Sequence, residues 1–155
     1  MNKFKITALF AISIFATTCS NDQMLRTRAN ELAQKFIITD GHIDTPWKLS
    51  KTYEDISLRT KTGDFDYVRA KEGGLDVPFM AIYIPSSYLE TGGAKEKADS
   101  LIDMVEQIAN KDPDKFEIAY SLSDANRIFK EGKVALPMGM ENGAGIEDDI
   151  KNLKH

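Results

Sequence analysis

The stretch GGLDVPFMAIYIP, residues 73–85, decides the fold class of this chain. Within it, residues 79–84 form a continuous apolar run that is rich in aromatic and β-branched side chains and is bracketed by glycine and proline. A strand that is buried on both faces has this composition, because helices cover both faces of a parallel sheet. The stretch therefore predicts a buried strand of an α/β domain.

A helix is predicted directly after this strand, over residues 94–111. Its apolar side chains recur three and four positions apart and end before Pro113, which is typical of an amphipathic helix. They are Ala98, Leu101, Ile102, Val105, Ile108 and Ala109. The same spacing predicts a helix over residues 24–36. A shorter one is predicted over residues 121–132, with Ser123 as its N-cap and Gly132 just past its end.

Two further strands complete the predicted order of elements. The run FIITD, residues 36–40, precedes Gly41, and a second apolar run covers residues 134–140 and is followed by Glu141. Proline inside that run is unfavourable for a central strand, because it removes a ladder donor. Residues 48–72 are polar and weakly periodic, so they are predicted to be a long functional loop. Alternating helices and buried strands predict parallel βαβ units with right-handed crossovers.

The composition is that of an ordinary folded domain. The chain has 155 residues and a net charge of −4, which fits about one domain and excludes disordered and fibrous classes. The mild acidity argues against a nucleic-acid partner, which calls for a basic patch. No internal repeat is visible.

The first residues predict export. Lys3 and Lys5 precede an apolar segment, residues 6–16, which is too short to span a bilayer comfortably and is followed by small residues. We expect a signal peptide over residues 1–19 and a mature domain over residues 20–155. Cys19 is the only cysteine and lies where a bacterial lipoprotein carries its lipid anchor, which would hold the protein on the membrane facing the periplasm or cell exterior. A plain signal peptide or a transmembrane anchor are the alternatives.

Three residues are candidates for a metal site. His42 and Asp44 lie two positions apart in DGHIDTPW, residues 40–47, after a predicted strand. In extended backbone such residues point to the same side, so imidazole and carboxylate can bind one ion, with zinc favoured over manganese or iron. The alternative is a hydrogen-bonded His–Asp pair. Glu141 also follows a predicted strand, and its alternative is a solvated carboxylate in an Asn-Gly turn.

Together, DGHIDTPW, GGLDVPFMAIYIP and VALPMGMENGAGIEDD resemble the opening motifs of the membrane dipeptidase (renal dipeptidase) family of zinc peptidases. The resemblance implies a (β/α)8 barrel, of which this chain would form the N-terminal part with about three βα units. It also implies two zinc ions and a dipeptide substrate. His42 and Asp44 would bind one ion and Glu141 would bridge both, while Asp40 and Trp47 would shape the site.

The resemblance also predicts that the chain is truncated and inactive by itself. In the family, two further histidines and the substrate-binding residues come from later strands, and His155, the only other histidine here, matches none of them. His155 is expected to be an exposed helical side chain. A homodimer of the complete enzyme is left open.

Two other functions are left open as well. One is another binuclear-metal amidohydrolase on the same barrel, acting on an acylated amino acid or a lactone, which the downstream substrate-binding residues would distinguish. The other is a non-catalytic surface lipoprotein, whose function would survive the substitutions His42→Ala and Glu141→Ala.

Overall fold

The computed structural model describes residues 21–154, which fall into two units. The first is a helix over residues 21–35, which confirms the helix predicted near this position and carries an ion pair between Arg28 and Glu31 (3.0 Å). The second unit begins at Ile37. The predicted signal peptide, Cys19 and His155 lie outside the described residues. Between residues 21 and 154, no helix is both long enough and apolar enough to cross a membrane.

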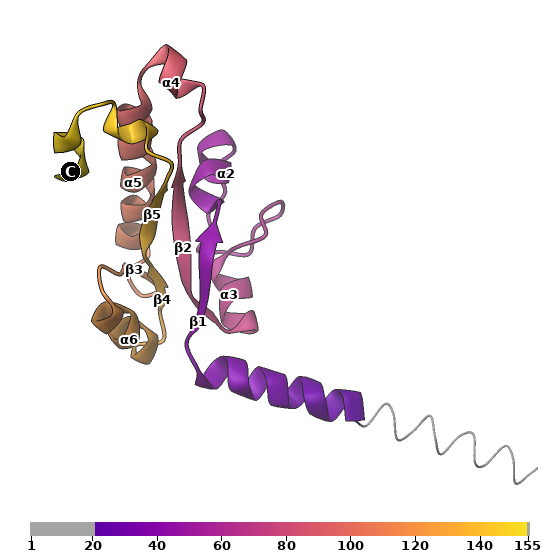
Figure 1. The fold of residues 1–155 in the computed structure, drawn as a ribbon. Helices are drawn as coiled ribbons and strands as arrows, with labels where there is room; N and C mark the ends of the chain where they lie inside the picture. The colour runs from indigo at the N-terminus through magenta and orange to yellow at the C-terminus, as the bar shows by residue number, and fades with distance from the viewer. Residues whose placement is uncertain (1–20, 155) are drawn as a thin grey trace, which may run out of the picture. The chain divides into compact units, whose positions relative to one another are not determined.

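A parallel sheet organises the second unit (Figure 1). Its strands are β1 (Ile38–Ile43), β2 (Leu75–Tyr83) and β5 (Met138–Glu141), in the order β1-β2-β5, and both neighbouring pairs are parallel. Because parallel strands end at the same edge of a sheet, the last residues of β1 and β5 lie near one another. The predicted α/β class with parallel strands is confirmed.

Strand β2 carries much of the core. Met80 and Ile82 of β2, and Ile84 directly after it, are almost fully buried and belong to one cluster with apolar residues of helix α5 (Ala94–Lys111). The α5 members of this cluster are Ala94, Ala98, Leu101, Val105 and Ala109. The prediction that β2 is buried on both faces was wrong at Phe79, which is 37% exposed. Its side chain lies on the sheet face opposite this cluster, since side chains alternate along a strand.

Proline divides the last predicted strand in two. Residues 134–140 form β4 (Val134–Leu136), then Pro137, then β5. Strand β4 pairs in parallel with β3 (Phe116–Ile118), which the sequence analysis missed, whereas β5 pairs with β2. Proline donates no backbone hydrogen bond, but its carbonyl accepts one from the Met80 amide (2.8 Å). Pro137 therefore lies where the chain passes from one sheet to the other.

The prediction that residues 48–72 form only a loop was wrong. Helix α2 (Thr45–Lys51) begins before this segment and α3 (Tyr67–Gly73) ends it. Asp66 caps α3, since its side chain accepts from the Arg69 amide, and Gly74 ends it at φ 79. Both helices have seven residues, which is too short for a clear helical period in the sequence.

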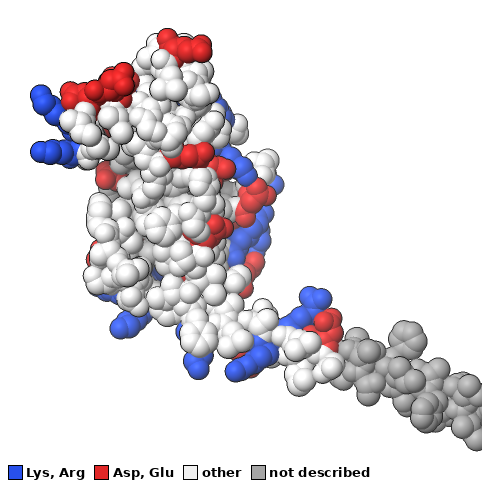
Figure 2. Space-filling model, in the orientation of Figure 1, with Lys and Arg blue, Asp and Glu red and all other residues white. Residues whose placement is uncertain are grey.

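The remaining helices are short. They are α4 (Tyr88–Thr91), α6 (Leu122–Lys130) and two 3₁₀ segments, η1 (Ala144–Ile146) and η2 (Ile150–Lys154). Helix α6 is capped by Ser121, whose side chain accepts from the Asp124 amide, so the prediction of Ser123 as N-cap was wrong. On the face that Figure 2 presents, a broad area of this unit is uncharged, and charged side chains gather mainly along its margins.

Candidate metal centre

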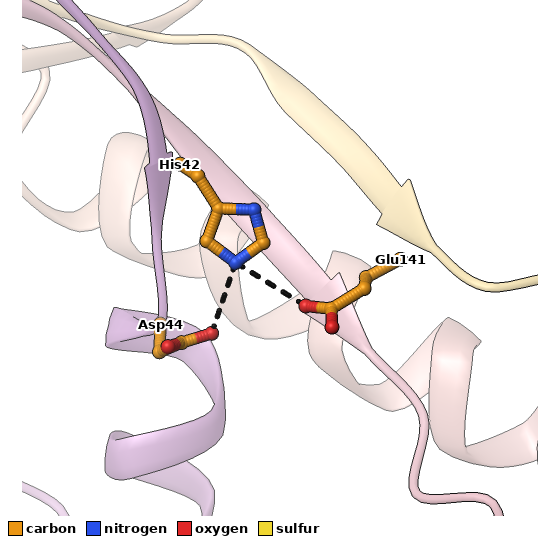
Figure 3. Close-up of side chains that lie close together, drawn as sticks. All are labelled: His42, Asp44 and Glu141. Atoms are coloured by element: carbon orange, nitrogen blue, oxygen red, sulfur yellow. Dashed lines mark hydrogen bonds and ion pairs between the residues drawn. The ribbon is translucent and has the colours of Figure 1, made fainter.

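His42, Asp44 and Glu141 converge at the end of the sheet where β1 and β5 finish (Figure 3). The His42 Nε2 atom lies 3.3 Å from Asp44 Oδ1 and 3.2 Å from Glu141 Oε2. One possible ligand atom from each residue lies within 4.8 Å of the other two. The three side chains are 42–53% exposed, so a small ligand can reach them.

Asp44 lies at the N-cap of α2 but does not use its carboxylate to cap the helix. An N-cap aspartate ordinarily accepts a hydrogen bond from one of the first free backbone amides of the helix. Here φ is −83° and ψ is 21°, so Asp44 has left the extended conformation of β1, and its Oδ1 atom points to His42. The predicted convergence of His42 and Asp44 is present. It arises at a strand-to-helix junction and not from two positions of one extended strand.

His42 lies at an irregularity of β1. The register advances three residues from Asp40 to Ile43, while the partner β2 advances two, from Pro78 to Met80. An extra residue of this kind is a β-bulge, which leaves backbone groups unpaired and turns a side chain. The Asp40 carboxylate accepts a hydrogen bond from the His42 amide (3.0 Å). Asp40 therefore supports the backbone from which the imidazole projects.

Glu141 is the last residue of β5 and is paired in register with Tyr83 of β2. The chain then turns at Asn142, whose φ is 64. The sequence shows an Asn-Gly pair at this turn, Asn142 and Gly143. Gly143 has an ordinary φ of −92, however, so the residue in the left-handed region is Asn142.

Trp47 packs beside this edge of the sheet. Its ring contacts the Tyr83 ring edge-on, with centroids 5.3 Å apart. The Lys51 and Lys97 ammonium nitrogens lie 4.1 and 5.3 Å from the centroid of the indole ring. Burial lowers the pKa of Lys97, and the charge of Lys51 lowers it further. Trp47 thus fixes α2 against the end of β2, next to the strand that carries Glu141.

A hollow of about 400 Å³ opens beside the candidate ligands. It is lined by His42 and Glu141 and by residues of all three strands, namely Gly41, Phe79, Met80, Ala81, Gly139, Met140 and Asn142. Gly41 and Gly139 have no atom within 4 Å of the position that a Cβ would take, so the backbone stays accessible at both. The hollow can admit a small polar molecule to His42 and Glu141.

The donor set fits one zinc ion. Two ligands on a tetrahedral zinc, each about 2.1 Å from the ion, stand about 3.4 Å apart. The separations of 3.2 and 3.3 Å from His42 Nε2 match that spacing. Imidazole nitrogen and carboxylate oxygen are both zinc ligands, and a catalytic zinc with three protein ligands keeps a position open for water or substrate. The Asp44 carboxylate does not cap α2 and is therefore available to bind a metal ion.

The three residues predicted as metal ligands thus lie together. The sequence reasoning missed the bulge at His42 and the side chain of Asn142. The Asn-Gly pair was a visible turn signal for the second, whereas a bulge leaves no distinct sequence signal.

Comparison with known proteins gives the family. Residues 26–155 match the family model described as membrane dipeptidase (peptidase family M19). Dipeptidase ataJ from Aspergillus terreus is 26% identical over 140 residues, which is 81% of this chain and 33% of that protein. The chain therefore spans about a third of the length of this relative.

Solved structures share the fold. The probable dipeptidase PvdM from Pseudomonas aeruginosa superposes with a TM-score of 0.73 at 24% identity, over 85% of this chain and 34% of that one. A metallopeptidase from Rhodobacter sphaeroides, liganded with a phosphinate mimic of the dipeptide L-Ala-D-Ala, gives a TM-score of 0.63 at 21% identity, over 77% of this chain and 42% of that one. These matches and the parallel strands agree with the opening part of the predicted barrel.

Proposed function

Because the chain belongs to the membrane dipeptidase family of metallopeptidases, we propose that its site serves the zinc-dependent hydrolysis of dipeptides. The observation that carries the proposal is the convergence of His42, Asp44 and Glu141 at the carboxyl end of parallel strands. In α/β folds with parallel strands, chemistry is located at this end of the sheet. The relatives named above supply the substrate class.

Each residue has a distinct part in this proposal. His42 and Asp44 would hold one zinc ion, and Glu141, whose Oε2 atom lies 3.2 Å from His42 Nε2, would be shared between that ion and a second one. When bound, the metal polarises the scissile carbonyl and activates water. Phe79, which is 37% exposed, borders the hollow and offers apolar contact to a substrate side chain.

Metal content and turnover test the proposal in the protein expressed from its own gene. Zinc should copurify with it, a chelator should abolish dipeptide hydrolysis, and added zinc should restore it. His42→Ala and Glu141→Gln should each lose bound zinc and lose activity. Glu90→Gln, an exposed glutamate of α4, is the matched control and should keep both. Full turnover in the Glu141→Gln variant would contradict the proposed role of Glu141, and a wild-type protein with neither bound zinc nor dipeptide turnover would favour the non-catalytic scaffold.

We also propose that the protein is exported and anchored through a lipid on Cys19. The support is the sequence alone, namely a charged start, a short apolar segment and a single cysteine at its end. The mass of the N-terminal peptide of the mature protein tests this directly. A diacylglyceryl cysteine at its first position is expected, and Cys19→Ser should move the protein from the membrane fraction to the soluble one. A mature N-terminus beyond Cys19 would contradict the anchor.

A further inference from the structure

The residue after Glu141 connects β5 to β2 through its side chain. The last pair in the parallel register is Tyr83 with Glu141, so the next pair along would be Ile84 with Asn142. The backbone of Asn142 turns into the left-handed region instead, at φ 64, and the ladder stops. Its side-chain Nδ2 donates to the carbonyl of Ile84 at 2.5 Å. The side-chain amide thus takes the place of the missing backbone hydrogen bond.

The same side chain also fixes the turn that follows. Its Oδ1 atom accepts a hydrogen bond from the Ala144 amide (2.9 Å), at the first residue of η1. Ile84 is fully buried, so the bond from Nδ2 reaches an immobile part of the core. The backbone that carries Glu141 is therefore held on one side by the β5–β2 ladder and on the other by Asn142.

Asparagine is the residue type that this position requires. The left-handed region is strained for most side chains, and asparagine, aspartate and glycine tolerate it best. Glycine would supply no hydrogen bond. Aspartate could accept from the Ala144 amide but could not donate to the Ile84 carbonyl. Asparagine alone combines the backbone conformation with one donor and one acceptor at the right places.

We propose that Asn142 is a positioning residue for the metal centre. It fixes the Glu141 backbone so that Glu141 Oε2 comes within 3.2 Å of His42 Nε2, and loss of its side chain lets that carboxylate move away from the other two ligands. This inference rests on the proposed function, because it presupposes that the three side chains bind zinc. Residues that orient metal ligands in this way affect metal affinity by roughly 10- to 100-fold.

Zinc affinity and stability, measured together, test the inference. The variant Asn142→Gly keeps the left-handed backbone and deletes both hydrogen bonds. The matched control is Asn152→Ala, which deletes a comparable bond from Asn152 Nδ2 to the Ile146 carbonyl (2.9 Å) in the same C-terminal segment. Both variants and His42→Ala are made in the protein expressed from its own gene. Zinc affinity is measured by competition with a chromophoric chelator, the ligand geometry by visible absorption of the cobalt(II)-loaded protein, and stability by urea unfolding of the metal-free form.

Asn142→Gly should weaken zinc binding by at least about tenfold and change the cobalt spectrum, while Asn152→Ala leaves both unchanged. If Asn142→Gly keeps wild-type zinc affinity and only unfolds more easily, Asn142 is a turn residue and the inference is wrong, although the metal site stands. If His42→Ala also keeps wild-type affinity, the proposed zinc site itself is wrong and the inference falls with it. Should the glycine variant fail to fold, Asn142→Asp, which tolerates the left-handed region and can accept from the Ala144 amide but cannot donate to the Ile84 carbonyl, should show a loss of affinity as well.

Discussion

Replacing the buried carboxylate of Asp66 should release the segment between α2 and α3. Asp66 is fully buried and accepts hydrogen bonds from the Thr60 amide (3.0 Å), the Thr60 hydroxyl (3.2 Å) and the Arg69 amide (2.8 Å). It also pairs with the Arg69 guanidinium. One carboxylate therefore caps α3 and ties down the residues before it.

The cost of the substitution Asp66→Asn follows from these contacts. The amide oxygen can keep the bond to the Arg69 backbone, so the cap survives, but the charge that faces the guanidinium is lost and an N–H₂ group meets the Thr60 amide. Breaking a buried ion pair costs about 3–5 kcal/mol, and the Arg69 side chain is 34% exposed, which lowers that figure. We expect a loss of about 2–3 kcal/mol in the free energy of unfolding of this segment. That loss raises its open population roughly 30- to 150-fold.

Limited proteolysis with trypsin measures this opening locally. Arg59 and Lys61 are exposed and lie on either side of Thr60, which Asp66 holds in place. Cleavage after them should therefore accelerate in step with the open population of this segment. Urea unfolding measures the global effect on the same samples. Asp64→Asn is the matched control, since Asp64 is 87% exposed and pairs with the exposed Lys48, and it should change neither readout. Equal cleavage rates for wild type and Asp66→Asn would refute the claim that the Asp66 carboxylate holds this segment in place.

The pH dependence gives a second check on the same carboxylate. Burial alone would raise the pKa of Asp66, but hydrogen bonds from Arg69 and Thr60, with the charge of Arg69, outweigh it and leave the pKa below its ordinary value of 3.8. A carboxyl whose pKa is lowered by folding stabilises the fold above its unfolded pKa, and that contribution is lost as pH falls through the folded pKa. The difference between wild type and Asp66→Asn should therefore be full above pH 3.8 and shrink below it.

Three further results are expected. Leu101→Ala, at a fully buried position of α5, should lower the free energy of unfolding by about 2–5 kcal/mol in urea titrations, and Ile102→Ala, at its half-buried neighbour, should cost clearly less. Hydrogen bonds from Arg127 and Lys133 lower the pKa of Glu117 from 4.5 to about 2. The contribution of Glu117 to the free energy of unfolding should therefore decrease as the pH drops from 4.5 towards 2, and the Glu117→Gln variant should not show this decrease. The 155-residue chain expressed alone should aggregate in sedimentation velocity experiments, because β1 and β5 are the open edges of the described sheet, and a monodisperse sample would contradict this.

The long elements were predictable from the sequence because their burial is regular. Helix α5 has eighteen residues, enough for its apolar period to be unmistakable, and β2 ends in an uninterrupted apolar run that begins at Phe79. The short helices α2 and α3 escaped because seven residues complete barely two turns. Their existence depends on tertiary contacts and on the cap at Asp66, and the three-residue β3 depends likewise on its pairing with β4.

For the candidate site, the sequence predicted only that the side chains lie at the carboxyl ends of the strands. Placing His42 and Glu141 at the ends of two parallel strands follows from the order of elements, since all such ends meet at one edge. No sequence pattern shows the details that set the distances between the three side chains. Two of these details are the extra residue in β1 and the absence of a capping hydrogen bond from the Asp44 side chain to α2. Both depend on which local groups compete for the available hydrogen bonds.

Those details have one physical consequence in common. Each candidate ligand is held by contacts that do not involve the other two: His42 by the bulge and Asp40, Asp44 by its place at the start of α2, and Glu141 by the β2 ladder and Asn142. Three ligands positioned in this way need little rearrangement when an ion arrives, so little of the binding free energy is lost to ordering them. A metal that binds such a site should therefore leave the backbone around it largely unchanged.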